Sequence, residues 1–167
     1  MLQETQSERE ALIPIYIHQT VKEYALDITK YTGYFHDGAL LEIDARNSYI
    51  ILSLESAEIN PMEIGNIKIL SKSNTLFGKL HLKNVTAIKI NQELYTNTLS
   101  KSHDDGEILD LEIYPGKILL LIQWTNFPPK PKTNDVSRIE IEAEEIHWEN
   151  IPSAKGYKFH DPASGSD

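Results

Sequence analysis

The sequence predicts a mainly β protein (α+β by count of elements), folded as an antiparallel β-sandwich or partly rolled barrel of six to seven strands with one N-terminal helix. After Gly33, apolar residues recur at every second position, which is typical of half-buried strands. Turn-forming residues separate these runs at short intervals. Helical periodicity is confined to the first part of the chain, so the alternation of strands and helices that marks a parallel sheet is missing.

The helix is predicted for residues 15–31. Pro14 is tolerated in its first turn, and Gly33 can end it. The β-favouring residues 13–17 leave a short strand open as an alternative. The apolar side chains that would share one helix face are Ile17, Val21, Tyr24, Ala25 and Ile28.

The strands are predicted from alternation in later segments. The unbroken apolar run 118–122 predicts a central strand covered on both faces. Asn47 and the pair Pro115-Gly116 mark turns. Shifts in the inward-facing set predict bulges near Ser56 and at Glu144-Glu145. The segments are 39–44, 49–58, 76–90, 109–114, 117–124 and 138–149, with a short strand expected at 66–70.

The 167 residues are enough for one domain. We expect a flexible N-terminus at 1–13, a single β-rich domain at 14–152 and a flexible tail at 153–167. Cysteine is absent, which excludes disulfides, a thiolate nucleophile and a cysteine zinc site. No cofactor is expected. The chain shows neither a bilayer-length apolar run nor a secretory signal, so a cytoplasmic location is expected.

The charge is acidic and uneven. There are 25 acidic and 16 basic residues, for a net charge of −9, which argues against nucleic acid or an anionic membrane as a partner and favours another protein. Residues 66–102 carry six bases and one acid, whereas residues 103–149 carry eleven acids and four bases. Either the basic strands pair with acidic neighbours inside one sheet, or an acidic face awaits a basic partner.

Two predicted strands carry acidic side chains at two-residue spacing, which places them on one face about 7 Å apart. They are Asp110 and Glu112 on one strand, and Glu140, Glu142 and Glu144 on the other. Such a row can be a solvated face, a protein-binding face or a pair of hydrolytic carboxylates. No loop has the ligand spacing of a calcium site.

Trp124 and Phe127 are further candidates for binding. They precede a proline-rich segment, and exposed aromatic residues followed by prolines can form a recognition surface. A tryptophan that ends a buried strand also fits the core.

The motif His36-Asp37-Gly38 could orient a general base or supply two metal ligands. Adjacent residues in an extended strand point to opposite faces, however. In a structural interpretation, Asp37 binds backbone donors and Gly38 shapes a turn. No two of the six histidines are spaced at i, i+2 or i, i+4, so no metal site is predicted.

The order of several segments resembles a known group of proteins. Phe35-His36-Asp37-Gly38 leads into an alternating strand, and Leu52-Ser53-Leu54-Glu55 follows, with later segments at 78–85, 108–113 and 139–143. This order resembles small bacterial β-rich proteins with an F-H-D-[A/G/S] start, many uncharacterised and some grouped with immunity proteins of polymorphic toxin systems. The resemblance implies a non-enzymatic binding protein.

Three hypotheses of function follow. The first is a cytosolic protein-binding module, not an enzyme, which as an immunity protein would neutralise a basic toxin. The second is a small hydrolase that uses His36, Asp37 and a strand carboxylate. The third is a structural, self-associating β protein. The oligomeric state stays open in all three.

Overall fold

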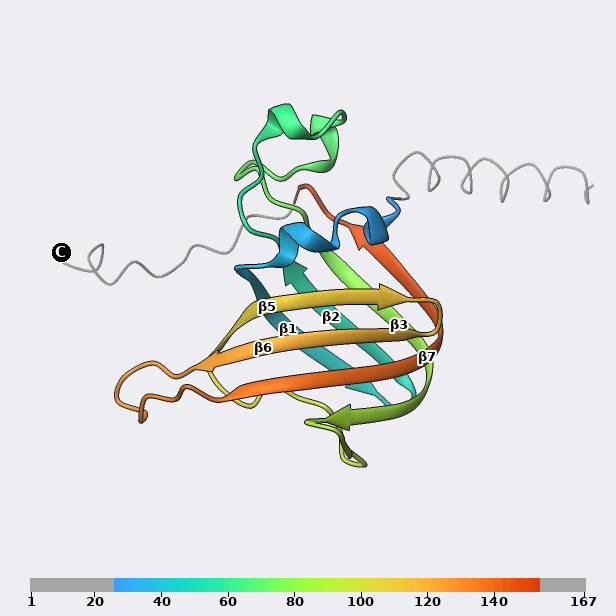
Figure 1. The fold of residues 1–167 in the computed structure, drawn as a ribbon, viewed down its shortest axis with the longest axis vertical. Helices are drawn as coiled ribbons and strands as arrows, with labels where there is room; N and C mark the ends of the chain where they lie inside the picture. Colours follow the sequence, from blue (N-terminus) through green and yellow to red (C-terminus); the bar gives the residue numbers. More distant parts are fainter. Residues whose placement is uncertain (1–25, 154–167) are drawn as a thin grey trace, which may run out of the picture.

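The structure is a computed structural model that describes residues 26–153, and this part of the chain forms a closed antiparallel β-barrel (Figure 1). Six of its strands close in the order β1-β5-β6-β7-β3-β2, and β2 pairs with β1 again. The mainly β prediction is confirmed, in its barrel form. The strands are β1 (Gly38–Arg46), β2 (Tyr49–Glu55), β3 (Phe77–Ile90), the short β4 (Glu93–Leu94) beside β3, β5 (Asp105–Tyr114), β6 (Lys117–Thr125) and β7 (Val136–Asn150).

The barrel interior is filled by alternate residues of each strand, because successive side chains point to opposite faces. In β6 the inward residues are Ile118, Leu120, Ile122 and Trp124, all buried. Leu119 and Leu121 point outward and stay half-buried. Within residues 26–153, no second layer lies over the outside of the barrel at β6, so the prediction that both faces of this strand are covered was wrong for this part of the chain.

The chain enters the barrel through two 3-10 helices, η1 (Ile28–Lys30) and η2 (Thr32–Phe35). The Asp27 side chain accepts a hydrogen bond from the backbone N–H of Thr29, which favours a tight turn. Of the predicted helix 15–31, residues 26–31 form only this turn, and the rest lies outside the described residues. So do the predicted flexible ends, apart from Ser153. Among the described residues, no helix is long and apolar enough to cross a membrane.

Residues 56–76 leave the sheet after β2 and form a projecting loop above the barrel (Figure 1). It carries the 3-10 helices η3 (Pro61–Glu63) and η4 (Ile67–Ile69). The strand predicted at 66–70 is wrong because the Asn66 side chain accepts the Lys68 N–H and caps a helical turn instead. The loop is anchored in the core by four buried side chains: Ile59, Ile64, Leu70 and Leu76.

The turns follow the sequence signals, but the bulges do not. Asn47 and Gly116 have positive φ, as predicted for turns. No bulge lies at Ser56, because the strand ends at Glu55. Nor does one lie at Glu144-Glu145, where β7 keeps its register against β3. The register shifts occur instead in β1 between Leu40 and Glu42, in β5 between Ile108 and Asp110, and in β3 between Val85 and Ala87.

The uneven charge of the sequence is explained by the long β3–β7 ladder. This ladder brings the basic middle of the chain beside its acidic C-terminal part, and opposite charges across a ladder are modestly stabilising. Three lysines of β3 lie directly opposite glutamates of β7: Lys79 opposite Glu149, Lys83 opposite Glu145 and Lys89 opposite Glu140. Three of the eleven acids of residues 103–149 thus lie opposite lysines, and one of these pairs, Lys83 with Glu145, approaches to 4.0 Å.

Candidate functional site

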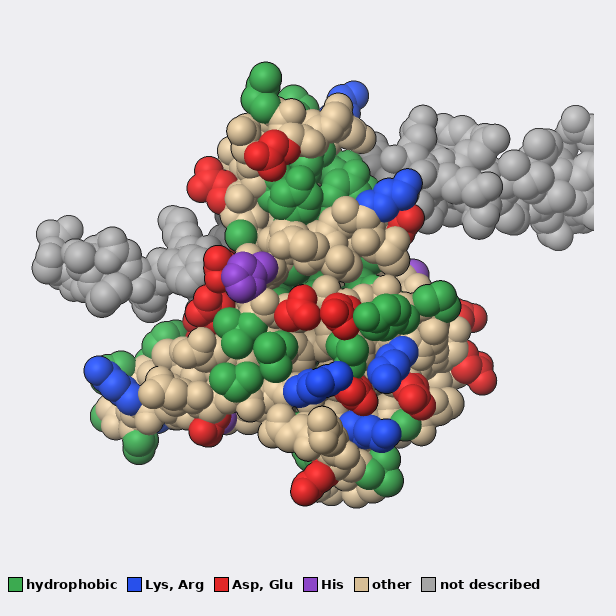
Figure 2. Space-filling view, viewed as in Figure 1, with side chains coloured by type: hydrophobic (Ala, Val, Ile, Leu, Met, Phe, Trp, Pro, Cys, Tyr) green, Lys and Arg blue, Asp and Glu red, His purple; other side chains and the backbone are tan. Residues whose placement is uncertain are grey.

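The outside of β5, β6 and β7 forms one continuous sheet surface, which we call the outer face (Figure 2). In the register of β5 and β6, Asp110 lies opposite Leu121, and Glu112 lies opposite Leu119. Figure 2 shows acidic, basic and apolar side chains mixed over these strands. The residues of the outer face are Asp110, Glu112, Tyr114, Lys117, Leu119, Leu121, Val136, Arg138, Glu140 and Glu142.

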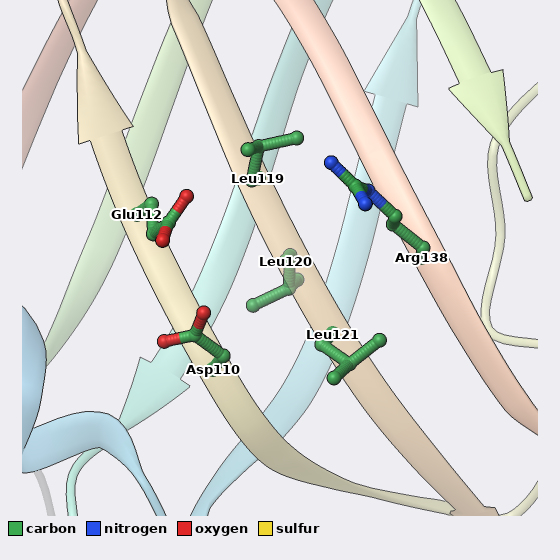
Figure 3. Close-up of a pocket in the computed structure, with 6 residues that line it drawn as sticks. All are labelled: Asp110, Glu112, Leu119, Leu120, Leu121 and Arg138. Carbon is green, nitrogen blue, oxygen red and sulfur yellow. The ribbon is translucent and has the colours of Figure 1, made fainter. Parts of the chain in front are cut away.

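A hollow of about 150 Å³ lies in the middle of the outer face (Figure 3). Its floor is apolar, because Leu119 and Leu121 line it and Leu120 lies beneath them in the barrel. Asp110 and Glu112 of β5 form one wall, and Arg138 of β7 lies on the opposite side.

The charges of the outer face are compensated only in part. Glu140 is 14% exposed and contacts both Arg138, at 3.3 Å, and Lys117, at 3.9 Å. Among the described residues, Asp110 and Glu142 have no ion pair within 4.0 Å. The two cations are thus held by one carboxylate, and the outer face keeps a negative excess beside the hollow.

Two exposed apolar side chains lie at opposite ends of the outer face, Tyr114 beside Lys117 and Val136 beside Gln123. Tyr114 is 48% exposed and Val136 is 44% exposed. The Tyr114 hydroxyl donates a hydrogen bond to a Glu112 oxygen at 2.9 Å. This bond to a carboxylate raises the pKa of Tyr114. The tyrosine therefore lies fixed over the end of β5 with its ring accessible.

The other predicted binding residues are placed differently. Trp124 is 1% exposed, and its Nε1 donates to the Ser137 hydroxyl at 2.8 Å, so it belongs to the core. Phe127 is 46% exposed in the loop after β6. Its backbone N–H donates to Asp104, a carboxyl whose pKa is lowered chiefly by the Lys130 ammonium. Glu144 is exposed but accepts a hydrogen bond from Asn84.

The His36-Asp37-Gly38 motif lies at the start of β1, outside the hollow. Asp37 has a positive φ, and its carboxylate lies 3.5 Å from His36 Nε2. Both side chains are about two-thirds exposed. The predicted bonding of the Asp37 carboxylate to backbone donors is not observed among the described residues. Gly38 serves by having no side chain, because a Cβ would meet the Glu55 carbonyl oxygen at 2.3 Å.

His36 is fixed by a hydrogen bond that its Nδ1–H donates to the Leu109 carbonyl at 2.6 Å. This bond raises the pKa of His36, and the nearby Asp37, Glu107 and Asp110 raise it further. The motif thus gathers a histidine near several carboxylates on an open surface. The hollow shares Asp110 with this group but is not lined by His36 or Asp37.

A histidine cluster that the sequence did not predict lies on the outside of β2, β3 and β7. His81 and His147 are opposite each other, with parallel rings whose centroids are 4.6 Å apart. His81 binds Tyr49 through Nδ1 and Glu149 through Nε2. Only the strand register brings these residues together, and no local pattern in the sequence signals it.

The histidine cluster predicts a dependence of stability on pH. Burial lowers the pKa of His147, and His81 and Lys83 lower it further. Below about pH 6.5 the unfolded chain therefore binds this proton more readily than the folded chain, so acidification reduces the free energy of unfolding. In urea denaturation from about pH 7.5 to about pH 5.5, we expect His147→Gln to lose less stability than the wild type.

His36 gives a control of opposite sign. Its raised pKa means that the folded chain holds this proton more tightly, which stabilises below about pH 6.5 and is lost as the pH rises through the folded pKa. His36→Gln should therefore lose more stability on acidification than the wild type. If His147→Gln and His36→Gln lost the same stability on acidification, the opposite pKa shifts of the two histidines would be contradicted.

Within residues 26–153, no three His, Asp or Glu side chains are grouped closely enough to hold a metal ion. No family model matches the chain, and comparison with curated proteins and with solved structures finds no similar protein. Its function must therefore be inferred from the geometry of the outer face and the clusters beside it.

Proposed function

We propose that this chain is a protein-binding module that contacts a basic partner through its outer face. The observation that carries the proposal is the combination of an apolar centre with uncompensated carboxylates. Leu119 and Leu121 supply apolar surface where partner contact would exclude water. Asp110 and Glu112 beside them would steer a cationic partner and set its orientation.

A binding role is favoured over hydrolysis by the shape of the site. The hollow has space for one side chain and is lined by leucines, whereas His36 and Asp37 lie on an open surface outside it. A toxin with a basic active-site cleft is a partner of the proposed kind, which agrees with the resemblance of the sequence to immunity-like proteins.

The test is binding to basic proteins encoded beside the gene, measured by biolayer interferometry at low and high salt. We expect association to slow with salt, and the double reversal Asp110→Lys with Glu112→Lys to weaken binding by at least about 10-fold. Glu58→Lys with Glu63→Lys, on the projecting loop, changes the net charge equally and should alter the affinity by less than about 3-fold.

Two outcomes would overturn the proposal. One is that no basic neighbour binds the full chain. The other is that both pairs of charge reversals weaken binding equally, because the loss of affinity would then follow from the net charge of the protein and not from the outer face.

A further inference from the structure

The alternation of inward and outward residues changes phase in the middle of β5. Ile108 is buried inside the barrel, and the next buried residue of the strand is Leu111, an odd number of positions later. Leu109 is the extra residue, because the register against β6 shifts between Ile108 and Asp110. An extra residue of this kind is a β-bulge, and it moves every later side chain of its strand to the opposite face.

The bulge determines on which face the acidic wall of the hollow lies. Without the extra residue, Asp110 and Glu112 would continue the inward set of Ile108 and point into the apolar interior, where an unpaired carboxylate is strongly unfavourable. With the bulge, both side chains lie on the outer side of β5, beside the hollow (Figure 3). The outer face therefore owes its two carboxylates at this place to the bulge.

The His36-Asp37 motif holds this bulge from the β1 side. The backbone ladder between β1 and β5 ends at Asp37, whose N–H donates to the Ile108 carbonyl at 2.9 Å. At the next position a side chain replaces the backbone donor, because His36 Nδ1–H donates to the Leu109 carbonyl at 2.6 Å. Two consecutive carbonyls at the bulge are therefore bound by two consecutive residues of the motif.

The contact with Leu109 also fixes the proton on His36. A carbonyl oxygen only accepts hydrogen bonds, so Nδ1 carries the proton in the neutral ring, and protonation adds an N–H at Nε2, which faces Asp37 at 3.5 Å. Among the described residues, the carboxylates that favour the protonated ring are Asp37 beside it, and Glu107 and Asp110 of β5. By linkage, a cation bound at Asp110 lowers the proton affinity of His36, and protonation of His36 weakens binding of that cation.

We propose that His36 is a positioning residue of the outer face, whose imidazole holds the β5 bulge in the form that presents Asp110 and Glu112 to a cationic partner. It acts through the Leu109 carbonyl. This inference rests on the proposed function, and it adds the residue that sets the geometry of the acidic wall and makes binding there sensitive to pH.

The first test needs no partner and compares His36→Leu with His36→Asn in the full chain. The asparagine amide is bonded to Cγ, as Nδ1 is in histidine, so it can keep the hydrogen bond that leucine loses. We expect amide hydrogen exchange at residues 109–112 to be at least about 5-fold faster in the leucine variant and close to the wild type in the asparagine variant. In the neutral wild type, the nitrogen chemical shifts of the His36 ring should show the proton on Nδ1. Equal exchange in the two variants, or a proton on Nε2, would overturn the proposal.

The second test uses a blocked hexalysine peptide as a cationic probe at low salt, followed by the amide chemical shifts of Asp110 and Glu112. Lysine keeps its charge between about pH 5.5 and about pH 7.5, so a change in affinity over this range comes from the protein. On acidification, the affinity of the wild type should fall by at least about 2-fold more than that of His36→Asn. His147→Gln removes a histidine from the histidine cluster instead and should keep the wild-type profile. Equal profiles for the wild type and His36→Asn would overturn the link between His36 and the acidic wall.

The two proposals can fail separately. If the exchange and the ring shifts are as expected but neither hexalysine nor a basic protein binds the outer face, His36 still holds the bulge and the proposed function is wrong. If a basic protein binds through Asp110 and Glu112 but His36→Leu leaves the exchange of residues 109–112 unchanged, the positioning role is wrong and the proposed function stands.

Discussion

Replacing Trp124 with alanine is expected to lower the free energy of unfolding by about 4 kcal/mol. The indole is 1% exposed inside the barrel, where it packs against Gly106 and stacks on His103 with ring centroids 5.6 Å apart. Alanine would leave a large cavity and remove the hydrogen bond to Ser137. Urea denaturation followed by circular dichroism measures the loss, and the melting temperature should fall by about 12 °C.

Phe127→Ala is the matched control, because Phe127 is 46% exposed three residues later in the chain. Its free energy of unfolding should change by less than about 0.5 kcal/mol. A loss below about 1 kcal/mol for the Trp124 variant would mean that this side chain is not part of the core.

Gly78→Ala is the second substitution with a large expected effect, about 3 kcal/mol of destabilisation. Gly78 lies in β3 between β2 and β7. A Cβ there would meet the Glu149 carbonyl oxygen at 2.2 Å and the Trp148 ring at 2.6 Å. The carbonyl belongs to the backbone of the paired strand, so relief requires β7 to move. Thermal and urea denaturation both report the loss.

Gly65→Ala provides the comparison, because a Cβ at this position in the projecting loop has no neighbour within 4 Å. Its stability should stay within about 1 kcal/mol of the wild type, on either side. If the two glycine variants were equally stable, this would contradict the close packing of β3 against β7 at Gly78.

The strands could be predicted from the sequence because their signals are local. Period-two alternation and turn residues such as Asn47 and Gly116 act over a few neighbouring residues. The short helices were less predictable. At 66–70 the apolar residues suit a strand, but one side-chain cap from Asn66 favours a turn.

The site could be predicted only in part, because it depends on pairing between distant segments. Asp110 and Glu112 were found from their spacing, and the structure places both at the hollow. Glu140 was also predicted, but the sequence does not show that Arg138 and Lys117 compensate it. The neighbours of Glu140 depend on the register of β5, β6 and β7. In the same way, register places Glu149 beside His81, 68 residues away in the chain.

The alternation along β6 has a consequence for how such a protein can change. Ile118, Leu120 and Ile122 hold the barrel together, whereas the two leucines between them meet the surroundings. Selection can therefore act on inward residues of this strand for folding and on the adjacent outward residues for surface contacts. A lineage could acquire a new partner by exchanging outward residues while every inward residue, and with it the ability to fold, stays as it is.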